Sequence, residues 1–148
     1  MAKILITGAS GFIGNHVTRL CVERGDRVRV MVMPGEDRAP FQGLDVEFVE
    51  GNLLEPASLS KAVEGVEQLY HMAAMFAVWT KDPDLHFKIN VDGTQALLRA
   101  AMAAGVEKVV YTSSIAAIGI NADRQAIGDV EALRNNLHQS FTEVLSLA

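Results

Sequence analysis

A short glycine-rich stretch near the start of the chain constrains the fold more than any other feature of the sequence. Residues 3–14 read Lys-Ile-Leu-Ile-Thr-Gly-Ala-Ser-Gly-Phe-Ile-Gly, which predicts a buried strand, a tight turn and the beginning of a helix. Gly8 can adopt a positive φ where the strand ends, and Gly11 has no Cβ to block an approaching group. Gly14 allows the helix to lie close against the strand.

The first turn of the predicted helix has the properties of an anion site. Its backbone N–H groups have no partner within the helix, and the positive end of the helix dipole lies there too. A lysine after the last glycine would indicate the phosphate loop of an NTPase, but Asn15 stands there. A tight strand-to-helix connection without a ligand is the alternative. The position of the glycines between a strand and a helix favours a dinucleotide.

The composition is typical of a single globular domain. The chain has 148 residues, of which 49% are hydrophobic, and this is enough for a core. A net charge of −5 gives no electrostatic reason to expect nucleic acid or an anionic membrane as a partner. Cys21 is the single cysteine, which excludes an internal disulfide and fits a reducing compartment. No apolar run approaches the ~20 residues of a membrane span and Met1 leads directly into the first strand, so a cytoplasmic location is predicted.

Strands and helices alternate along the rest of the chain. Strands are predicted over residues 27–33, 46–49, 66–72 and 108–113, and helices over residues 16–23, 56–63 and 83–104. A glycine follows each helix, at Gly25, Gly65 and Gly105, as expected for helix ends. This order predicts one doubly wound parallel α/β sheet, the Rossmann fold, with about five strands and flanking helices over residues 1–148.

Two of the helices have apolar stripes. The helix over residues 83–104 is expected to bury Phe87, Val91, Thr94, Leu98 and Ala101. A final amphipathic helix is predicted from Gly128 to Ala148, and its stripe is formed by Val130, Leu133, Leu137, Phe141, Val144 and Leu145. Because an apolar stripe must be covered, we expect this tail to pack against the sheet or against a second subunit.

Five motifs occur in the order and at the spacing found in a known superfamily. They are Thr7-Gly8-x-x-Gly11-x-x-Gly14, Gly51-Asn52-Leu53, His71-Met72-Ala73-Ala74, Asn90-Val91-Asp92-Gly93-Thr94 and Tyr111-Thr112-Ser113-Ser114. Together they resemble the extended short-chain dehydrogenases/reductases, in particular the nucleotide-sugar epimerases and dehydratases, the hopanoid-associated sugar epimerases and the dihydroflavonol-reductase-like enzymes. The resemblance covers residues 1–120 and implies the cofactor-binding half of such an enzyme, with NAD or NADP as its ligand.

The resemblance also implies which residues form the site. For the cofactor they are Gly8, Ser10, Gly11, Phe12, Ile13, Gly14, Asn52, Leu53, Ala73, Ala74, Asn90 and Ser113. Ser114 takes the position of the catalytic serine or threonine, which hydrogen-bonds the substrate oxygen. In the family, Asn90 braces the strand that carries this serine. Asn52 stands where the family has an aspartate, and a simple strand-to-helix turn is the alternative for it. His71 is expected to be a core residue.

The end of the second predicted strand indicates which dinucleotide is preferred. Rossmann domains place an acid about 20 residues past the glycines, where it binds the ribose 2′-hydroxyl. Val32 and Met33 occupy the strand end, so no carboxylate is expected there to repel a 2′-phosphate, and Arg38 follows. The sequence therefore favours NADP over NAD, with an ordinary solvated loop charge as the alternative for Arg38.

The Tyr-x-x-x-Lys pair of the family is missing from the 148 residues. The tyrosine transfers the substrate proton and the lysine lowers its pKa, so the reaction depends on both. The chain has only Tyr70 and Tyr111, and no lysine follows Lys108. The C-terminal part that binds substrate in the family is expected to be missing as well. The four histidines show no metal-ligand spacing with cysteine or carboxylates, so no metal is predicted.

Two functional classes remain open. The first is an NAD(P)-dependent oxidoreductase or epimerase that acts on a nucleotide sugar or a ketone, of which these residues are the nucleotide half. The second is a non-catalytic nucleotide-binding module or a truncated remnant, which the missing pair favours for this polypeptide. Because the family commonly dimerises through the long helix and its neighbour, a homodimer is expected through residues 83–104 and the tail helix.

Overall fold

The computed structural model describes residues 1–76 and 80–114. Residues Met1–Tyr111 form one compact unit, and Thr112 begins another. The tail helix predicted over residues 128–148 lies outside the described residues. That helix and the organisation of residues 1–148 as a single domain therefore stay predictions.

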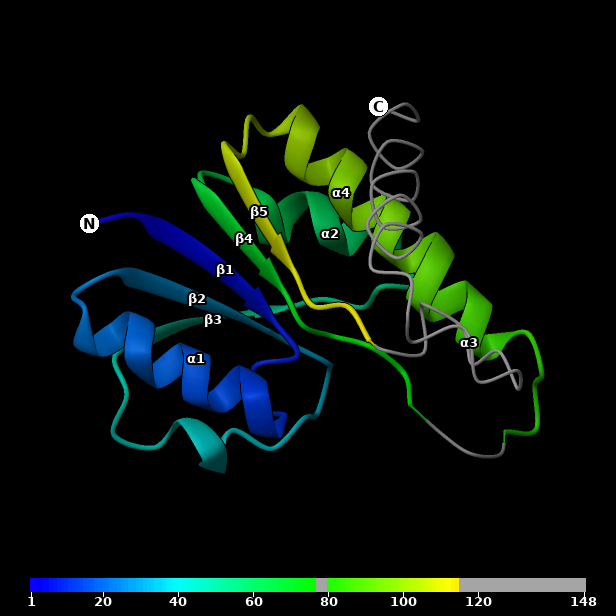
Figure 1. Ribbon diagram of the computed structural model, residues 1–148, viewed down its shortest axis with the longest axis horizontal. Coiled ribbons are helices and arrows are strands. Elements are labelled where there is room, and N and C mark those ends of the chain that lie inside the picture. The colour runs from blue at the N-terminus through cyan, green and yellow to red at the C-terminus, as the bar shows by residue number, and fades with distance from the viewer. Residues whose placement is uncertain (77–79, 115–148) are drawn as a thin grey trace, which may run out of the picture. The chain divides into compact units, whose positions relative to one another are not determined.

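Five parallel strands form the sheet within the described part of the chain (Figure 1). They are β1 (Lys3–Thr7), β2 (Arg27–Val32), β3 (Val46–Glu50), β4 (Gln68–His71) and β5 (Lys108–Tyr111), in the order β3-β2-β1-β4-β5. All neighbouring strands run parallel. The chain proceeds from β1 to β3 on one side and then returns to β4 on the other, so the strand order reverses beside β1. The predicted doubly wound Rossmann sheet is confirmed.

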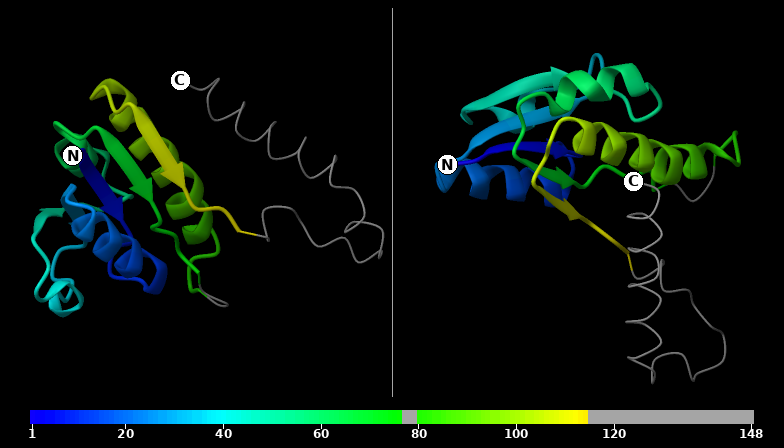
Figure 2. Two further views of the ribbon diagram at one scale, coloured as in Figure 1. Left: turned by 60° about the vertical axis from the view of Figure 1, so that its left-hand side comes forward. Right: turned by 90° about the horizontal axis from the view of Figure 1, so that it is seen from above.

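Helices cover both faces of this sheet. α1 (Phe12–Glu23) lies on one face, and α2 (Pro56–Val63) and α4 (Thr94–Ala103) lie on the other (Figures 1 and 2). A short 3₁₀ helix, η1 (Ala39–Phe41), precedes β3. Helices on both faces follow from right-handed crossovers, which pass over opposite faces once the strand order reverses.

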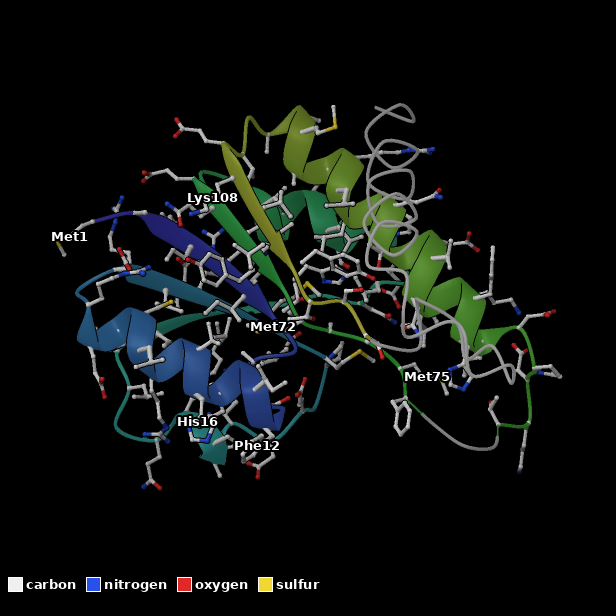
Figure 3. All side chains as sticks on the ribbon, viewed as in Figure 1. Met1, Phe12, His16, Met72, Met75 and Lys108 are labelled. Atoms are coloured by element: carbon white, nitrogen blue, oxygen red, sulfur yellow. The ribbon has the colours of Figure 1, made fainter. Side chains whose placement is uncertain are left out.

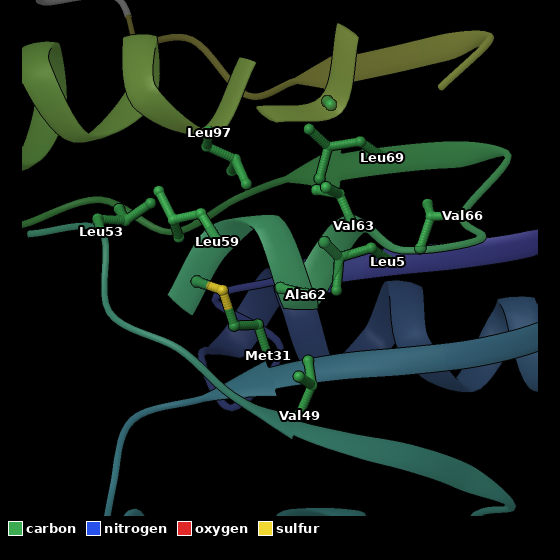
Figure 4. Packing of buried hydrophobic residues seen from close by; sticks show 11 residues of the cluster. Leu5, Met31, Val49, Leu53, Leu59, Ala62, Val63, Val66, Leu69 and Leu97 are labelled. Atoms are coloured by element: carbon green, nitrogen blue, oxygen red, sulfur yellow. The ribbon is translucent and has the colours of Figure 1, made fainter. Parts of the chain in front are cut away.

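The sheet separates two hydrophobic clusters. Between the sheet and the helices α2 and α4 lie Leu5, Met31, Val49, Leu53, Leu59, Ala62, Val63, Val66, Leu69, Leu97 and Ala101 (Figure 4). The cluster on the α1 face contains Ile4, Ile6, Ala9, Cys21, Val28, Val30, Val32 and Phe41. Alternate residues of a strand point to opposite faces, so β1 and β2 each supply both clusters. This is why both strands read as nearly continuous apolar runs.

Strands β2, β4 and β5 end earlier than the sequence predicted. Met33, Met72 and residues 112–113 all lie past the last residue of their strand. Met33 is exposed, whereas residues 28–32 before it in β2 are buried. These segments leave the sheet at its carboxyl edge, where the loops of an open α/β sheet form its binding site.

The long helix predicted over residues 83–104 is divided by a π-helical turn. α3 (Leu85–Phe87) and the π-helical η2 (Lys88–Gly93) lead into α4. Within η2, Gly93 lies so close to the core that a Cβ on it would come within 2.8 Å of the Leu53 Cβ. A π turn takes in one more residue than an α turn, so the side chains before and after it do not share one stripe.

The burial of this helix is partly as predicted. Thr94 and Ala101 are buried, which confirms the prediction for these two residues. Phe87, predicted to be buried, is 60% exposed. Leu97 is fully buried, whereas Leu98 is only partly buried against the core. The prediction was wrong for Phe87 because it extended one helical phase through the π turn.

Candidate functional site

The glycine turn between β1 and α1 has the predicted geometry. Gly8 has a φ of +67°, and a Cβ on it would lie 2.6 Å from the Ala73 nitrogen. A Cβ on Gly14 would lie 2.0 Å from the Gly8 carbonyl oxygen, so only glycine lets the helix approach the strand this closely. Gly11 has an extended backbone, and among the described residues a Cβ on it would meet only that same oxygen, at 3.3 Å. The turn is therefore open at Gly11.

The N-terminus of α1 is uncapped. Among the residues that the structure describes, no side chain caps its first N–H groups and no acid lies in its first turn. Phe12 and Ile13 begin the helix and are 83% and 61% exposed. The Phe12 ring packs edge to face on His16, with the ring centroids 5.0 Å apart (Figure 3). Because free N–H groups and the dipole both favour negative charge, this end of α1 attracts an anion.

The segment after β4 packs against the glycine turn and is fixed by hydrogen bonds. The Ala73 N–H donates to Thr7 Oγ1 at 3.2 Å. Figure 3 shows Met72 and Met75 along this segment, and Met75 forms two bonds with Asn90. The Met75 N–H donates to Asn90 Oδ1 at 2.7 Å, and Asn90 Nδ2 donates to the Met75 carbonyl at 2.9 Å.

Asn90 therefore has a different structural partner from the one expected. Its amide was predicted to brace the strand that carries the serine, which is β5. The structure shows that both ends of the amide bond the main chain of Met75, after β4, and the prediction was wrong in this respect. Its position in the π turn places it opposite this segment. A contact of Asn90 with the cofactor stays a prediction.

His71 is a buried and hydrogen-bonded core residue, as the sequence predicted. Its Nδ1 lies 2.7 Å from Thr7 Oγ1, and its Nε2 lies 2.9 Å from Thr94 Oγ1. The ring stacks on Tyr111, with centroids 5.2 Å apart. Burial lowers the pKa of His71 to about 4, so the imidazole is neutral at pH 7. The ring thus joins β1, β4, β5 and α4.

A carboxylate lies at the end of β2, contrary to the sequence-based expectation. Glu36 accepts a hydrogen bond from the Ser10 hydroxyl and another, at 2.6 Å, from the Met33 N–H. The sequence analysis missed this residue because it considered only the strand end itself. The chain turns back at Pro34 and Gly35, and the Glu36 N–H donates to the Met33 carbonyl at 3.0 Å.

Arg38, the predicted partner of a 2′-phosphate, has other partners in the structure. Its guanidinium carbon lies 4.7 Å from the centroid of the Phe48 ring. Its Nη2 donates to Glu50 Oε1 at 3.4 Å, and both of these side chains are more than half exposed. A role of Arg38 in cofactor binding stays a prediction.

Asn52 uses its whole amide within the turn that precedes α2. Its Oδ1 accepts the Leu54 N–H at 3.0 Å, and its Nδ2 donates to Glu55 Oε1 at 3.3 Å. The structure therefore shows the strand-to-helix turn that the sequence left open as an alternative. Leu53, predicted to contact the cofactor, is buried in the core, while its neighbour Leu54 is exposed.

Ser113 and Ser114 lie shortly after β5 and are exposed, and Ala74 is exposed in the segment after β4. Parallel strands end at the same edge of a sheet, so the chain leaves β5 at the edge where the glycine turn lies. The binding and catalytic roles of these three residues stay predictions.

Three polar residues of this edge were not assigned to the site by the sequence analysis. They are Thr7, Glu36 and Thr94. A Pro-Gly pair after a strand predicts a tight turn, and this signal could have placed Glu36 near the strand end. The two threonines belong to the family motifs, but a hydroxyl in a strand or helix does not indicate that His71 is its partner.

Neither a metal site nor a membrane-spanning helix is found in residues 1–76 and 80–114. No cluster of three or more His, Cys, Asp or Glu there could hold a metal ion. Within the same residues, no helix combines the length and the apolar character needed to cross a bilayer.

The fold and the glycine turn define the class of protein. A parallel sheet in the order β3-β2-β1-β4-β5, with Thr-Gly-x-x-Gly-x-x-Gly after β1, is the Rossmann domain of an extended short-chain dehydrogenase/reductase. A model of the 3-beta hydroxysteroid dehydrogenase/isomerase family matches residues 5–146. The chain belongs to this family.

Known relatives agree with this assignment. Sterol demethylase protein B of Methylococcus capsulatus is 43% identical over 117 residues, which are 79% of this chain and 36% of that protein. A putative dihydroflavonol 4-reductase of Synechocystis is 38% identical over 120 residues, 81% of this chain and 35% of the relative. The predicted resemblance to extended short-chain dehydrogenases/reductases, including dihydroflavonol-reductase-like proteins, is confirmed.

A related crystal structure contains a nucleotide. It is a short-chain dehydrogenase/reductase superfamily protein from Agrobacterium tumefaciens with bound NAD, 35% identical and with a TM-score of 0.67. The match covers 78% of this chain and 33% of that chain. The present chain thus spans about a third of the length of these relatives.

Proposed function

We propose that this chain is the NAD(P)-binding part of an extended short-chain dehydrogenase/reductase. The observation that carries the proposal is the uncapped N-terminus of α1 beside a turn that is open at Gly11. A pyrophosphate fits this place because its negatively charged oxygens can accept hydrogen bonds from the free N–H groups. The NAD in the related Agrobacterium tumefaciens structure supports a nicotinamide dinucleotide as the ligand.

The proposal gives a role to each of the exposed residues near the turn and to the serine of the family motif. The pyrophosphate accepts hydrogen bonds from the N–H groups of Phe12 and Ile13, whose exposed apolar side chains exclude water from it. Ala73 and Ala74 form the wall beside the nicotinamide half, where small side chains leave the backbone accessible. Ser114, after β5, hydrogen-bonds the oxygen of the substrate, as its counterpart does in the family.

Titration calorimetry with NADH tests the binding proposal. Gly11→Leu should abolish binding, because its side chain would occupy the space of the pyrophosphate while the extended backbone at Gly11 accepts any residue. Ala103→Leu is the matched control. It introduces the same side chain at an exposed position where α4 ends, at the opposite edge of the sheet. Unaltered thermal unfolding of both variants shows that the fold is kept. Failure of the folded wild-type chain to bind NADH or NADPH would refute the proposal.

The reaction of the complete family is oxidoreduction or epimerisation of a nucleotide sugar or a ketone. The 148 residues contain no Tyr-x-x-x-Lys pair, so they should bind cofactor without turning over such substrates. Proton transfer by such a pair typically contributes ~10²–10⁴-fold to the rate. Hydride transfer from NADH or NADPH to ketone substrates, followed at 340 nm, measures this. Rapid turnover by the purified chain would favour a complete enzyme over a nucleotide-binding module.

A homodimer through the long helix is a second part of the proposal. Phe87 and Met102 are large apolar residues exposed on this helical segment, and a second subunit would cover them. Light scattering of the wild-type chain and of Phe87→Glu tests this. A monomeric mass at high concentration, unchanged by the substitution, would refute the dimer.

The NADP preference that the sequence indicates stays a prediction. It depends on Arg38, whose guanidinium is shared between Phe48 and Glu50. Tighter binding of NADPH than of NADH, lost in Arg38→Ala, would support it.

A further inference from the structure

A tight turn returns Glu36 to the carboxyl end of β2. In the sequence Met33-Pro34-Gly35-Glu36, proline holds the second position and glycine the third, with a φ of +77° at Gly35. The Glu36 N–H closes the turn by donating to the Met33 carbonyl at 3.0 Å. These are the features of a type II turn, whose third position needs a positive φ that glycine adopts readily. The position of Glu36 is therefore specified by its own local sequence.

The Glu36 carboxylate connects two segments of the proposed cofactor site. One oxygen, Oε1, accepts from the hydroxyl of Ser10 in the glycine turn, and the other accepts from the Met33 N–H at 2.6 Å. A Rossmann domain holds the adenosine ribose between the glycine turn and the end of β2. Each carboxylate oxygen can accept about two hydrogen bonds, so Glu36 keeps acceptor capacity for a ligand hydroxyl.

The charge at this place decides between two ligands. A carboxylate accepts a hydrogen bond from a ribose 2′-hydroxyl. It repels a 2′-phosphate, because the phosphate carries a charge of about −2. Glu36 follows Gly14 by about 20 residues, the separation at which Rossmann domains place their ribose-binding acid. Arg38, the cation that could offset the repulsion, is engaged by Glu50 and Phe48. Resting on the proposed dinucleotide function, we infer that Glu36 selects NAD over NADP, against the preference that the sequence indicated.

Calorimetric titrations with NADH and with NADPH test this inference on the 148-residue chain. The wild type should bind NADH at least about tenfold more tightly, because like charges placed together oppose binding strongly. Glu36→Gln keeps the shape of the side chain and removes its charge. This variant should bind NADPH at least about tenfold more tightly than the wild type does, so that the preference is lost. AMP and adenosine 2′,5′-bisphosphate, which differ only in the 2′-phosphate, should show the same change.

Asp37→Asn is the matched control. It removes the same charge from the neighbouring residue, whose exposed carboxylate accepts the Ala39 N–H at 2.9 Å. Its ratio of NADH to NADPH affinity should equal that of the wild type. Tighter binding of NADPH by the wild type, or a ratio unchanged in Glu36→Gln, would overturn the inference and leave the proposed function intact. Binding of neither dinucleotide by the folded wild type would refute the proposed function, and the inference with it.

Discussion

β1 and β5 have similar sequences but different surroundings. β1 reads Lys-Ile-Leu-Ile-Thr and β5 reads Lys-Val-Val-Tyr, and both patterns predict buried strands. Residues 4–6 in β1 have no exposed surface. In β5, by contrast, Val109 is 42% exposed, and Val110 and Tyr111 are similarly exposed. The two strands differ in position, because β1 has a neighbour on each side and β5 is an edge strand in the described sheet.

The difference shows that apolar sequence predicts a strand better than it predicts burial. An edge strand buries its side chains only where another element covers it. The proposed cofactor site also depends on the central strand. The glycine turn, Thr7 and the strand-order reversal all belong to β1, so the best-packed strand also organises the proposed cofactor site. The predictions below measure how far the centre and the edge of the sheet differ in stability.

The largest difference in the free energy of unfolding is expected when a side chain of each strand is truncated to alanine. Leu5→Ala should lower the free energy of unfolding by about 4 kcal/mol, because it leaves a cavity in a fully buried cluster. Val109→Ala should lower it by less than about 1 kcal/mol, since the side chain is partly exposed already. Urea unfolding followed by circular dichroism measures both. Equal losses would show that β5 is as well packed as β1.

The next largest effect is acid destabilisation through His71, which is bonded to Thr7 of β1. The pKa of His71 is lowered to about 4 by burial, below the ~6.5 of an unfolded histidine. The unfolded state therefore binds more protons between these values, and stability is lost as the pH falls from ~6.5 towards ~4. The loss should reach about 3 kcal/mol at and below pH 4. In His71→Asn the free energy of unfolding should show no such loss between pH ~6.5 and ~4. A wild-type curve as flat as that of the variant would contradict a buried neutral imidazole.

A smaller effect is expected where the segment after β4 is joined to the helix. Asn90→Ala removes both hydrogen bonds to Met75 and should cost about 2 kcal/mol, because the Met75 N–H and carbonyl lose their partners. Arg99→Ala, at an exposed position of α4, is the control and should change stability by less than about 0.5 kcal/mol. Hydrogen exchange at the Met75 amide should accelerate only in Asn90→Ala. Unchanged protection of that amide would contradict the assignment.

The smallest effect is expected at the edge strand itself. Val110→Thr should alter the free energy of unfolding by less than about 0.5 kcal/mol, because a partly exposed hydroxyl can bond to water. Val28→Thr, in β2, buries the hydroxyl and should cost about 2 kcal/mol. Thermal unfolding of the pair tests the contrast, and a loss in Val110→Thr as large as that in Val28→Thr would show that the edge is covered.

The sequence alone was sufficient for the features that depend on neighbouring residues. The glycine spacing predicted the turn between β1 and α1, because the positive φ of Gly8 and the close approach at Gly14 are local requirements. The alternation of apolar runs and helical stripes predicted the doubly wound sheet, because a strand buried on both faces needs helices on each side. The family motifs in the same segments led to the same assignment.

Only the tertiary structure determined which distant groups meet. Arg29 reads as a charge inside a strand, yet its guanidinium donates to the carbonyls of Ala62 and Glu64 and to the Glu47 carboxylate, each at 2.8 Å. Asn90 bonds to the segment after β4, and Glu36 bonds to the glycine turn, neither of which is near in sequence. The sequence around a polar residue does not indicate which distant group its side chain will bond. The partner is fixed only when the sheet and its helices bring separate segments within hydrogen-bonding distance.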